Sequence, residues 1–309
     1  MLHKKIIIIA TILLTFGPSA GAQQFGLSWI SHPAPDSISQ IWFRQTFTQE
    51  EKPEQIDITV ASTGYFELFV NERNVSTDVM APLRAPGDNE AIAVTYDITR
   101  FVRQGENTLA VWYSPATVHA DSLQLAAMCY GRYADGRRFA FHTDGGWLCH
   151  KANACINADG GEDIDATAFD QSWNGDIADM ALWLPTTEHQ GRPDDSALER
   201  KTNYRATKTT HLSRQKYFDI EGDSVTYTFE TAFRGLIRVT LRDAKRGSRI
   251  SVGNIRYTCS GESDEQIIQR FTTTDTRKLI LTGDKSFKPE QVYKVEALSL
   301  GEYRREWRY

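Results

Sequence analysis

The sequence predicts an all-β protein made of two antiparallel β-sandwich domains. Apolar residues alternate with polar residues over 56–60, and Phe66, Leu68 and Val70 alternate with Tyr65, Glu67 and Phe69, which is the two-residue period of strands that bury one face. Segments with a helical period are almost absent. Residues 186–203 lack apolar periodicity, contain Gly and Pro, and separate two sets of strand patterns. We therefore expect a first domain over residues 23–185, a linker over 186–203 and a second domain over 204–309.

Two turns are expected in the first domain. Residues 71–74 read Asn-Glu-Arg-Asn, and they predict a hairpin because Asn tolerates the left-handed backbone of a tight turn. Further along, Thr99 is placed to cap a short helical turn over residues 100–104, and Gly105 is placed to end it. Strand alternation then resumes at residues 109–111.

Later segments continue the antiparallel pattern. The Asp-Gly pair within residues 134–137 predicts a hairpin between two strand-like runs. In the second domain, apolar residues alternate over 225–229 and over 237–241. The Arg-Gly pair at 246–247 predicts a turn into one more strand at 250–252.

Residues 1–22 have the pattern of a cleavable export signal. A positively charged start is followed by an apolar run over residues 6–16 and by Ala-Gly-Ala at 20–22. The apolar run is shorter than the roughly 20 residues that a membrane span needs. We expect a mature chain that starts at Gln23, has no membrane span, and is periplasmic or secreted. The first cysteine is Cys129, so no thiol lies near the cleavage site to accept a lipid.

The formal net charge is −5, and no block of Lys and Arg interrupts the sequence. Neutralisation of phosphates supplies most of the affinity of proteins for nucleic acid, so the charge argues against nucleic acid as a partner. The chain is long enough for two domains that each bury a core of their own.

The four cysteines, Cys129, Cys149, Cys155 and Cys259, permit three full disulfide pairings, and their spacing does not choose among them. Cys149 and Cys155 would close a small loop if the chain doubled back. A zinc site needs a tight cluster of ligands, and His150 is the only histidine nearby. We interpret the thiols as buried or locally bridged rather than as metal ligands.

Short motifs follow one another along the first domain: Asn71, Thr-Tyr-Asp-Ile-Thr at 95–99, Gly-Glu-Asn at 105–107, Thr143, Asp144, Trp147, Gly-Glu at 161–162, Asp-Ala at 165–166, Asp170 and Trp173. Their order resembles the N-terminal β-sandwich domain of bacterial α-L-rhamnosidases over nearly all of residues 25–185. The later strands are similar to the second β domain of the same enzymes, more loosely. The resemblance implies sandwiches of the galactose-binding-like or jelly-roll type.

The resemblance also bears on catalysis. In those enzymes the catalytic acid and base come from a separate (α/α) barrel, and no residue of this sequence matches that barrel. We therefore expect a chain without the catalytic domain. Thr167 stands where the family normally has Arg after Asp-Ala, and this difference removes a planar, bidentate partner for a carboxylate.

A search for catalytic residues gives none. Glycoside hydrolysis needs two positioned carboxylates. The densest local supply is in residues 162–165, with Asp170 nearby, and alternation places Asp163 and Asp165 on one strand face. Clustered acids of this kind usually form a solvated face, and that is our interpretation here. No Ser or Cys nucleophile motif occurs in the sequence.

A binding site is predicted in the loop of residues 85–90. Asp88, Asn89 and Glu90 offer hard oxygen donors of the kind that calcium prefers, and we name them as metal ligands. Pro-Gly-Asp-Asn is also good turn chemistry, so a solvated turn is the alternative. Some rhamnose-binding relatives use a calcium ion to bridge the sugar, and the resemblance therefore implies calcium as the one candidate cofactor.

Sugar binding needs an aromatic face and a few polar groups that take paired hydroxyls. We name Asp88, Asn89, Asp144 and Trp147 as the sugar-binding residues. Trp147 follows Asp144 in an expected loop and is the best exposed aromatic candidate, although burial of its ring in the core is the favoured interpretation.

The other aromatic residues are expected to be structural. Trp42, Trp112 and Trp173 are interpreted as core or inter-sheet packing. Tyr65 and Phe69 share a face opposite the apolar stripe of their strand, and in a two-layer sandwich that face meets solvent or a neighbouring domain.

Three hypotheses follow. The first is an exported, non-catalytic protein that binds a rhamnose-containing glycan and serves in the use of plant or pectic glycans. The second is a glycoside hydrolase acting on α-L-rhamnosides, either divergent or completed by a catalytic partner chain. The third is a structural subunit that docks on another exported protein. We favour the first.

Overall fold

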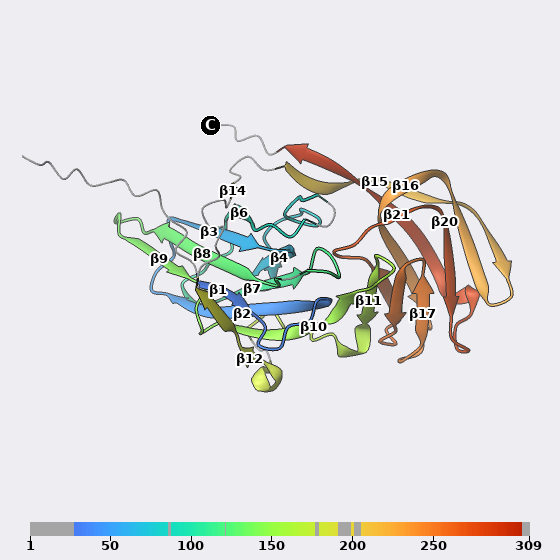
Figure 1. Cartoon of the computed structure of the whole chain (residues 1–309), viewed down its shortest axis with the longest axis horizontal. Helices are drawn as coiled ribbons and strands as arrows, with labels where there is room; N and C mark the ends of the chain where they lie inside the picture. Colours follow the sequence, from blue (N-terminus) through green and yellow to red (C-terminus); the bar gives the residue numbers. More distant parts are fainter. Residues whose placement is uncertain are drawn as a thin grey trace, which may run out of the picture.

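The computed structural model describes residues 28–85, 88–120, 122–176, 179–190, 199–200 and 205–304. All regular elements in these ranges are β-strands, apart from three single-turn 3₁₀ helices at Ala166–Ala168, Met180–Leu182 and Pro289–Gln291. Two halves lie side by side along the long axis of the molecule (Figure 1). The all-β class and the antiparallel sandwich architecture are therefore confirmed. The expected export signal, residues 1–22, lies outside the described residues.

The first half is a sandwich of two sheets. One sheet has the strand order β13 (Thr187–Gln190), β1 (Ser28–Ser31), β8 (Leu125–Arg132), β3 (Gln55–Ser62), β6 (Ile92–Asp97) and β14 (Glu199–Arg200), with β9 (Arg138–His142) paired to β8. The facing sheet has the order β10 (Leu148–Ile156), β2 (Ser39–Gln49), β7 (Gly105–Ser114), β4 (Tyr65–Val70) and β5 (Arg73–Asn74), with β12 (Leu184–Pro185) paired to β10.

The residues in the core of this sandwich follow from the alternation of side chains along each strand. In β4, Phe66, Leu68 and Val70 are buried between the sheets, whereas Tyr65 and Phe69 face the other way. That other face is covered by the same chain, because Tyr65 and Phe69 pack against a cluster that includes Trp173 and, from the second half, Phe271. Of the two alternatives expected for this face, solvent or a neighbouring domain, the structure shows the second.

The second half is a strongly bent sheet around its own core. Its strands are β15 (Arg205–Glu221), β16 (Ser224–Arg242), β17 (Arg249–Val252), β18 (Ile255–Thr258), β19 (Asp264–Ile268), β20 (Thr274–Gly283) and β21 (Val292–Arg304). The first part of β16 pairs with β15 and β20, and its last part pairs with β19 and β21. One long strand therefore belongs to both sides of the second core, which contains Phe229, Ile237 and Leu281.

A continuous sheet joins the two halves. Strand β11 (Glu162–Asp165) pairs with β10 on one side and runs parallel to β18 on the other, with Ile164 opposite Tyr257. Figure 1 shows β11 at the junction between the halves. On another side of the junction, the Tyr303 hydroxyl donates to Asp78 Oδ1 at 2.5 Å. Ala206, at the start of β15, is buried in the first core.

Two sequence expectations differ from the structure. Part of the expected linker consists of strands of the first sheet, because β13 pairs with β1 and β14 pairs with β6; residues 191–198 and 201–204 lie outside the described residues. Thr99 does not cap a helical turn, because its Oγ1 accepts the Ile56 N–H at 3.0 Å. Instead, Asp97 Oδ1 accepts the Thr99 N–H at 2.9 Å, and Gly105 follows with φ +90°.

The cysteines are free thiols. Cys129, Cys149 and Cys259 are buried, as expected, and burial raises the pKa of the Cys149 thiol to about 12. The expected local disulfide between Cys149 and Cys155 does not form, because both residues lie on the single strand β10. Six residues of extended strand separate their Cα atoms by about 20 Å, whereas a disulfide needs less than about 7 Å.

Candidate functional site

A cleft lies at the junction of the two halves. Its volume is about 560 Å³, within the roughly 300–1,000 Å³ range of small-molecule sites. The first half contributes Trp112 of β7, Gln40 of β2 and Phe169, which follows the first 3₁₀ helix. The second half contributes Arg246 and Arg270. Residues from both domains therefore line one concave surface.

Aromatic rings form one wall of the cleft. Phe169 stacks on Trp112 with ring centroids 6.2 Å apart and an interplanar angle of 24°. Behind them, Trp42 packs edge-on against Trp112 and stacks on Trp173 at 5.4 Å. Trp42, Trp112 and Trp173 are buried, as expected, but 41% of Phe169 is exposed. Phe169 is thus a solvent-facing ring held in place by a buried aromatic layer.

Arg270 fixes the second half against this wall. Its guanidinium lies 4.0 Å from the centroid of the Trp112 ring, and its Nη1 forms an ion pair with Glu67 of β4. The side chains of Arg270 and Glu67 are 31% and 15% exposed, so water screens this pair only in part.

Glu162 at the start of β11 holds the backbone of the same segment. Its carboxylate accepts the N–H groups of Arg270 at 3.1 Å and Phe271 at 2.6 Å, and the Thr272 hydroxyl at 3.3 Å. Complete burial raises the pKa of the Glu162 carboxyl, and these hydrogen bonds oppose the shift. Glu162 is therefore occupied by the loop between β19 and β20.

A second buried carboxylate in the cleft is occupied in the same way. Glu265 of β19 accepts the hydroxyl of Tyr257 at 3.0 Å and the N–H of Gly261 at 3.0 Å, and it also accepts the N–H of Ser260. Burial and the nearby Glu265 charge raise the pKa of Tyr257. Both buried carboxylates thus fix local backbone rather than facing an open position.

Two buried polar atoms on the cleft wall have no hydrogen-bond partner among the described residues. They are Gln40 Nε2 and Asn153 Oδ1. The other end of the Gln40 amide accepts the Trp112 Nε1–H at 2.7 Å, which fixes its orientation. Polar atoms left unsatisfied beside a cavity are unusual, because burial without a partner costs about 1–3 kcal/mol.

The sequence model of the α-L-rhamnosidase N-terminal domain family matches residues 51–208, half of the chain. This chain belongs to that family. It is 25% identical over 172 residues to an α-L-rhamnosidase of Formosa agariphila, a match that covers 48% of this chain and 17% of that protein. It is 20% identical over 225 residues to an α-L-rhamnosidase of Alteromonas sp., covering 68% of this chain and 24% of that protein.

Solved structures agree in fold. The α-L-rhamnosidase of Dictyoglumus thermophilum superposes with a TM-score of 0.79 at 18% identity, over 90% of this chain and 36% of that one. The α-L-rhamnosidase of Aspergillus terreus gives 0.78 at 17% identity, over 89% and 36%. The chain thus spans about a third of these structures and a quarter or less of the two curated relatives.

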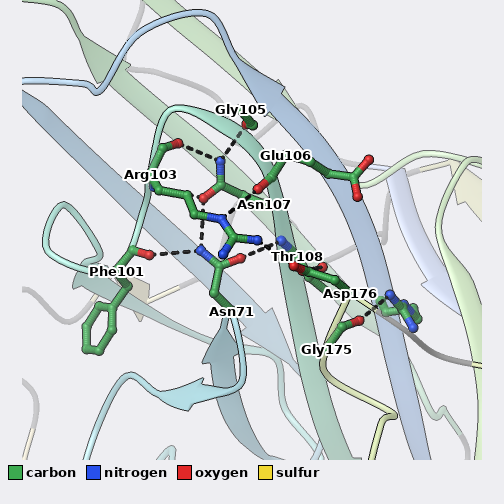
Figure 2. Close-up of polar contacts among 10 residues, drawn as sticks. Asn71, Phe101, Arg103, Gly105, Glu106, Asn107, Thr108, Gly175 and Asp176 are labelled. Atoms are coloured by element: carbon green, nitrogen blue, oxygen red, sulfur yellow. Dashed lines mark hydrogen bonds and ion pairs between the residues drawn. The ribbon is translucent and has the colours of Figure 1, made fainter.

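The rhamnosidase-like motifs at Asn71 and Asn107 form one hydrogen-bonded network (Figure 2). Asn71, with φ +50°, donates from Nδ2 to Phe101 O and to Asn107 Oδ1, both at 2.9 Å. Its Oδ1 accepts the Thr108 N–H at 2.9 Å. Asn107 in turn donates to the carbonyls of Arg103 and Gly105. These residues tie the β4–β5 hairpin to the start of β7, so their role is structural.

Two backbone carbonyls of the predicted calcium loop bind an arginine. Arg84 Nη1 donates to the carbonyls of Asp88 at 2.9 Å and Glu90 at 3.1 Å, and Asp88 Oδ1 accepts the Glu90 N–H at 2.8 Å. Asn89 lies beside them with a buried Oδ1 that has no partner among the described residues. A guanidinium bound at these carbonyls repels a divalent cation. As arranged, this donor set does not fit calcium.

Asp144 and Trp147 lie in a different loop, between β9 and β10. Trp147 is 2% exposed and belongs to the first core, so its ring is not available for stacking on a ligand. The turn explains this, because the Trp147 N–H bonds to Asp144 O at 3.2 Å and directs the ring inward at the start of β10. Asp144 is exposed, and its Oδ1 accepts the Gly146 N–H at 2.9 Å.

Sequence reasoning missed Phe169 and Arg270. Phe169 is a single aromatic residue in a polar stretch, and an isolated ring without strand alternation was its only signal. Arg270 carries no local signal, because its partner Glu67 lies 203 residues away in the sequence. Trp112 was identified, but only as core packing.

Among the described residues, no helix has the length and apolar character that crossing a bilayer requires.

Proposed function

We propose that this protein is an exported, non-catalytic carbohydrate-binding member of the α-L-rhamnosidase N-terminal domain family. Its ligand is a rhamnose-containing glycan of plant or pectic origin, bound in the cleft at the domain junction. The observation that carries the proposal is the exposed Phe169 ring, fixed on Trp112 at the edge of a polar cleft. Such a ring stacks on the C–H face of a pyranose.

The surroundings of Phe169 suit a neutral sugar. Arg246 is exposed on the cleft wall, and the Gln40 and Asn153 amides offer a donor and an acceptor of the kind that pairs with hydroxyls. Glu162 and Glu265, the buried acids of the cleft, are held by backbone N–H groups. Glycoside hydrolysis needs one carboxyl group that donates a proton and a second that acts as base or nucleophile. This arrangement supports binding over cleavage.

Calorimetric titration of residues 23–309 with L-rhamnose and with rhamnose-containing pectic oligosaccharides tests the proposal. We expect binding by the unaltered protein and a loss on the order of tenfold in affinity for Phe169→Ala, because one stacked ring is removed. Met180→Ala is the matched control, since Met180 is also exposed and apolar but lies outside the cleft. Absence of heat with every sugar would overturn the proposal.

Two further arms address the remaining hypotheses. Addition of a chelator is expected to leave the affinity unchanged, because the Arg84 guanidinium is bound at the carbonyls of Asp88 and Glu90. A loss of affinity with the chelator would instead support calcium bound by Asp88, Asn89 and Glu90. Release of the chromophore from an aryl α-L-rhamnoside by the purified chain would revive the hydrolase hypothesis, and release only after addition of a partner chain would support a two-chain enzyme.

A further inference from the structure

A second cavity of about 580 Å³ lies at the domain junction, next to the same loop that closes the first cleft. Arg270 lines the first cleft, and Phe271 and Thr272 line the second. The opposite walls come from Tyr65 and Arg84 of the first half and from Arg234 of the second. No role for this cavity follows from the site described above.

Arg84 places a buried positive charge in the cavity wall. Its side chain is 8% exposed, and its Nη1 and Nη2 donate only to backbone carbonyls, including Gly64 O at 2.8 Å and Asp88 O at 2.9 Å. Among the described residues it has no ion-pair partner. Neutral carbonyl oxygens satisfy the Nη1 and Nη2 groups, whereas the buried Nε has no hydrogen-bond partner among the described residues. The charge is left uncompensated, and a buried charge without a counter-ion is costly.

Arg234 adds an accessible positive charge on the facing wall. It is exposed, and no carboxylate pairs with it among the described residues. Tyr65 connects the two cations: Arg84 lies 5.6 Å from the centroid of its ring, and Arg234 acts on its phenol electrostatically. The cavity thus carries two arginines, one fixed and one free to meet a ligand.

The acidic residues near these charges are Asp88 and Glu302, and Asp275 lies opposite Arg234 in the pairing of β16 with β20. Asp88 lies within electrostatic range of Arg84, but its Oδ1 accepts the Glu90 N–H. Glu302 lines the cavity and is exposed, and it interacts with another group of the protein. The remaining lining is apolar or hydroxyl-bearing, with Met80, Leu83, Leu300, Thr272 and Thr273. Such a mixture suits a ring that has a C–H face and hydroxyl groups.

We propose that this cavity binds a uronate residue, with the sugar carboxylate paired to Arg234 and held in the field of Arg84. Guanidinium and carboxylate form paired, charge-assisted hydrogen bonds, which favour a carboxylate over a neutral hydroxymethyl group. The inference rests on the proposed function for the class of ligand, a glycan. It adds a second site that gives the protein a preference for acidic chains.

Digalacturonate and its dimethyl ester test the proposal on residues 23–309, because the ester keeps the rings and removes the charge. We expect digalacturonate to bind, the ester to bind on the order of tenfold or more weakly, and the affinity for the acid to fall with added salt. Equal binding of acid and ester, or binding of neither, would overturn the proposal. Acetate serves as the simple carboxylate, and an affinity equal to that of digalacturonate would show an anion site with no sugar preference.

The variant Arg234→Gln locates the site. Arg234 is exposed, so the substitution should leave the fold intact, and we expect digalacturonate affinity to fall on the order of tenfold. Arg138→Gln, at an exposed arginine of β9, is the control and should bind as the unaltered protein does. Unchanged affinity in Arg234→Gln would contradict the assignment.

These experiments test the two proposed binding sites independently. Rhamnose binding that is lost in Phe169→Ala and retained in Arg234→Gln reports on the first cleft alone. Digalacturonate binding with the opposite dependence reports on the second cavity. A protein that binds digalacturonate but no rhamnose would thus retain the uronate site and refute the proposed neutral-sugar cleft.

Discussion

At the scale of single residues, Glu162 links the ionisation of one carboxyl to the stability of the domain junction. Its pKa is raised above the ordinary value of 4.5 because the charged form is buried. The folded protein therefore keeps this proton to a higher pH than the unfolded chain does. Between the pKa of the unfolded chain and the higher pKa of the folded protein, unfolding releases this proton. The contribution of Glu162 to the free energy of unfolding therefore falls as pH rises through that range.

The variant Glu162→Gln removes this titration and keeps an Oε1 acceptor for the Phe271 N–H. We expect the stability of the variant relative to the unaltered protein to increase as pH is raised from about 4 to about 7. Urea unfolding at a series of pH values measures the difference, from which other titrating groups largely cancel. A difference that is flat or that decreases over this range would contradict the raised pKa.

Asn71 shows why a family motif recurs without a catalytic role. The side chain makes three hydrogen bonds, and the residue adopts a left-handed backbone that few side chains tolerate. We expect Asn71→Ala to lower the free energy of unfolding by about 2–4 kcal/mol. Arg73→Ala, in the same hairpin, should cost about 0.5 kcal/mol or less, since Arg73 is exposed. Chemical denaturation of both variants compares them directly, and similar costs would refute a structural role for the Asn71 network.

At the scale of elements, local pattern predicts strands and turns but not the partners of a strand. The alternation of β4, the Asn71 hairpin and the Asp135-Gly136 turn follow from adjacent residues, and the structure confirms each of them. The change of partners along β16 and the parallel pairing of β11 with β18 join segments that are distant in sequence. Side-chain periodicity does not encode which edge a strand meets.

In the candidate site, too, local sequence predicts some features, whereas others depend on contacts between distant segments. The Trp112 ring could be placed on a strand from alternation alone, whereas the exposure of Phe169 and the position of Arg270 depend on how the domains meet. For Trp147 the favoured interpretation, burial in the core, is confirmed, although the Gly-Gly pair before it had also made it a candidate for an exposed loop; the strand β10 begins directly after it. In the 88–90 loop, the carbonyls of Asp88 and Glu90 accept hydrogen bonds from Arg84, a contact that local sequence did not indicate, and sugar or calcium binding by this loop stays a prediction.

The junction strand β11 depends on a residue without a side chain. A Cβ atom added at Gly161 would lie 1.9 Å from Asn254 O, which is backbone and cannot move without displacing β17 and β18. We expect Gly161→Ala to destabilise the protein by about 3 kcal/mol or more. The control is Gly136→Ala, where φ is +87° and no atom lies within 4 Å of the added Cβ. There we expect a destabilisation of about 1 kcal/mol, which comes from the backbone conformation alone. Equal costs in urea denaturation would mean that β11 has room to shift.

At the scale of the whole molecule, the two halves share a sheet, an aromatic layer and a half-buried ion pair. Phe271 of the second half packs in the cluster of Trp42, Trp112 and Trp173, and Arg270 pairs with Glu67 across the junction. Both proposed ligand sites lie at this junction, so their geometry depends on the two halves keeping a fixed relation. An interface with these contacts predicts one cooperative unfolding transition rather than two.

Arg270→Met tests this coupling, because Met keeps much of the apolar volume and removes both the ion pair and the cation–π contact. We expect the free energy of unfolding to fall by about 1–3 kcal/mol, since Glu67 remains half-buried without its partner. Calorimetry should show the single transition of the unaltered protein broaden or split, and hydrogen exchange should show earlier loss of protection in β11 and β18 than in β3.

Arg242→Met is the matched control, because Arg242 also pairs with a carboxylate, Asp264, and lies over an aromatic ring, Tyr293, but at an exposed position away from the junction. If both variants kept one transition with equal midpoints, the junction would hold without Arg270, and the coupling would have to come from the β11–β18 pairing and the aromatic layer alone.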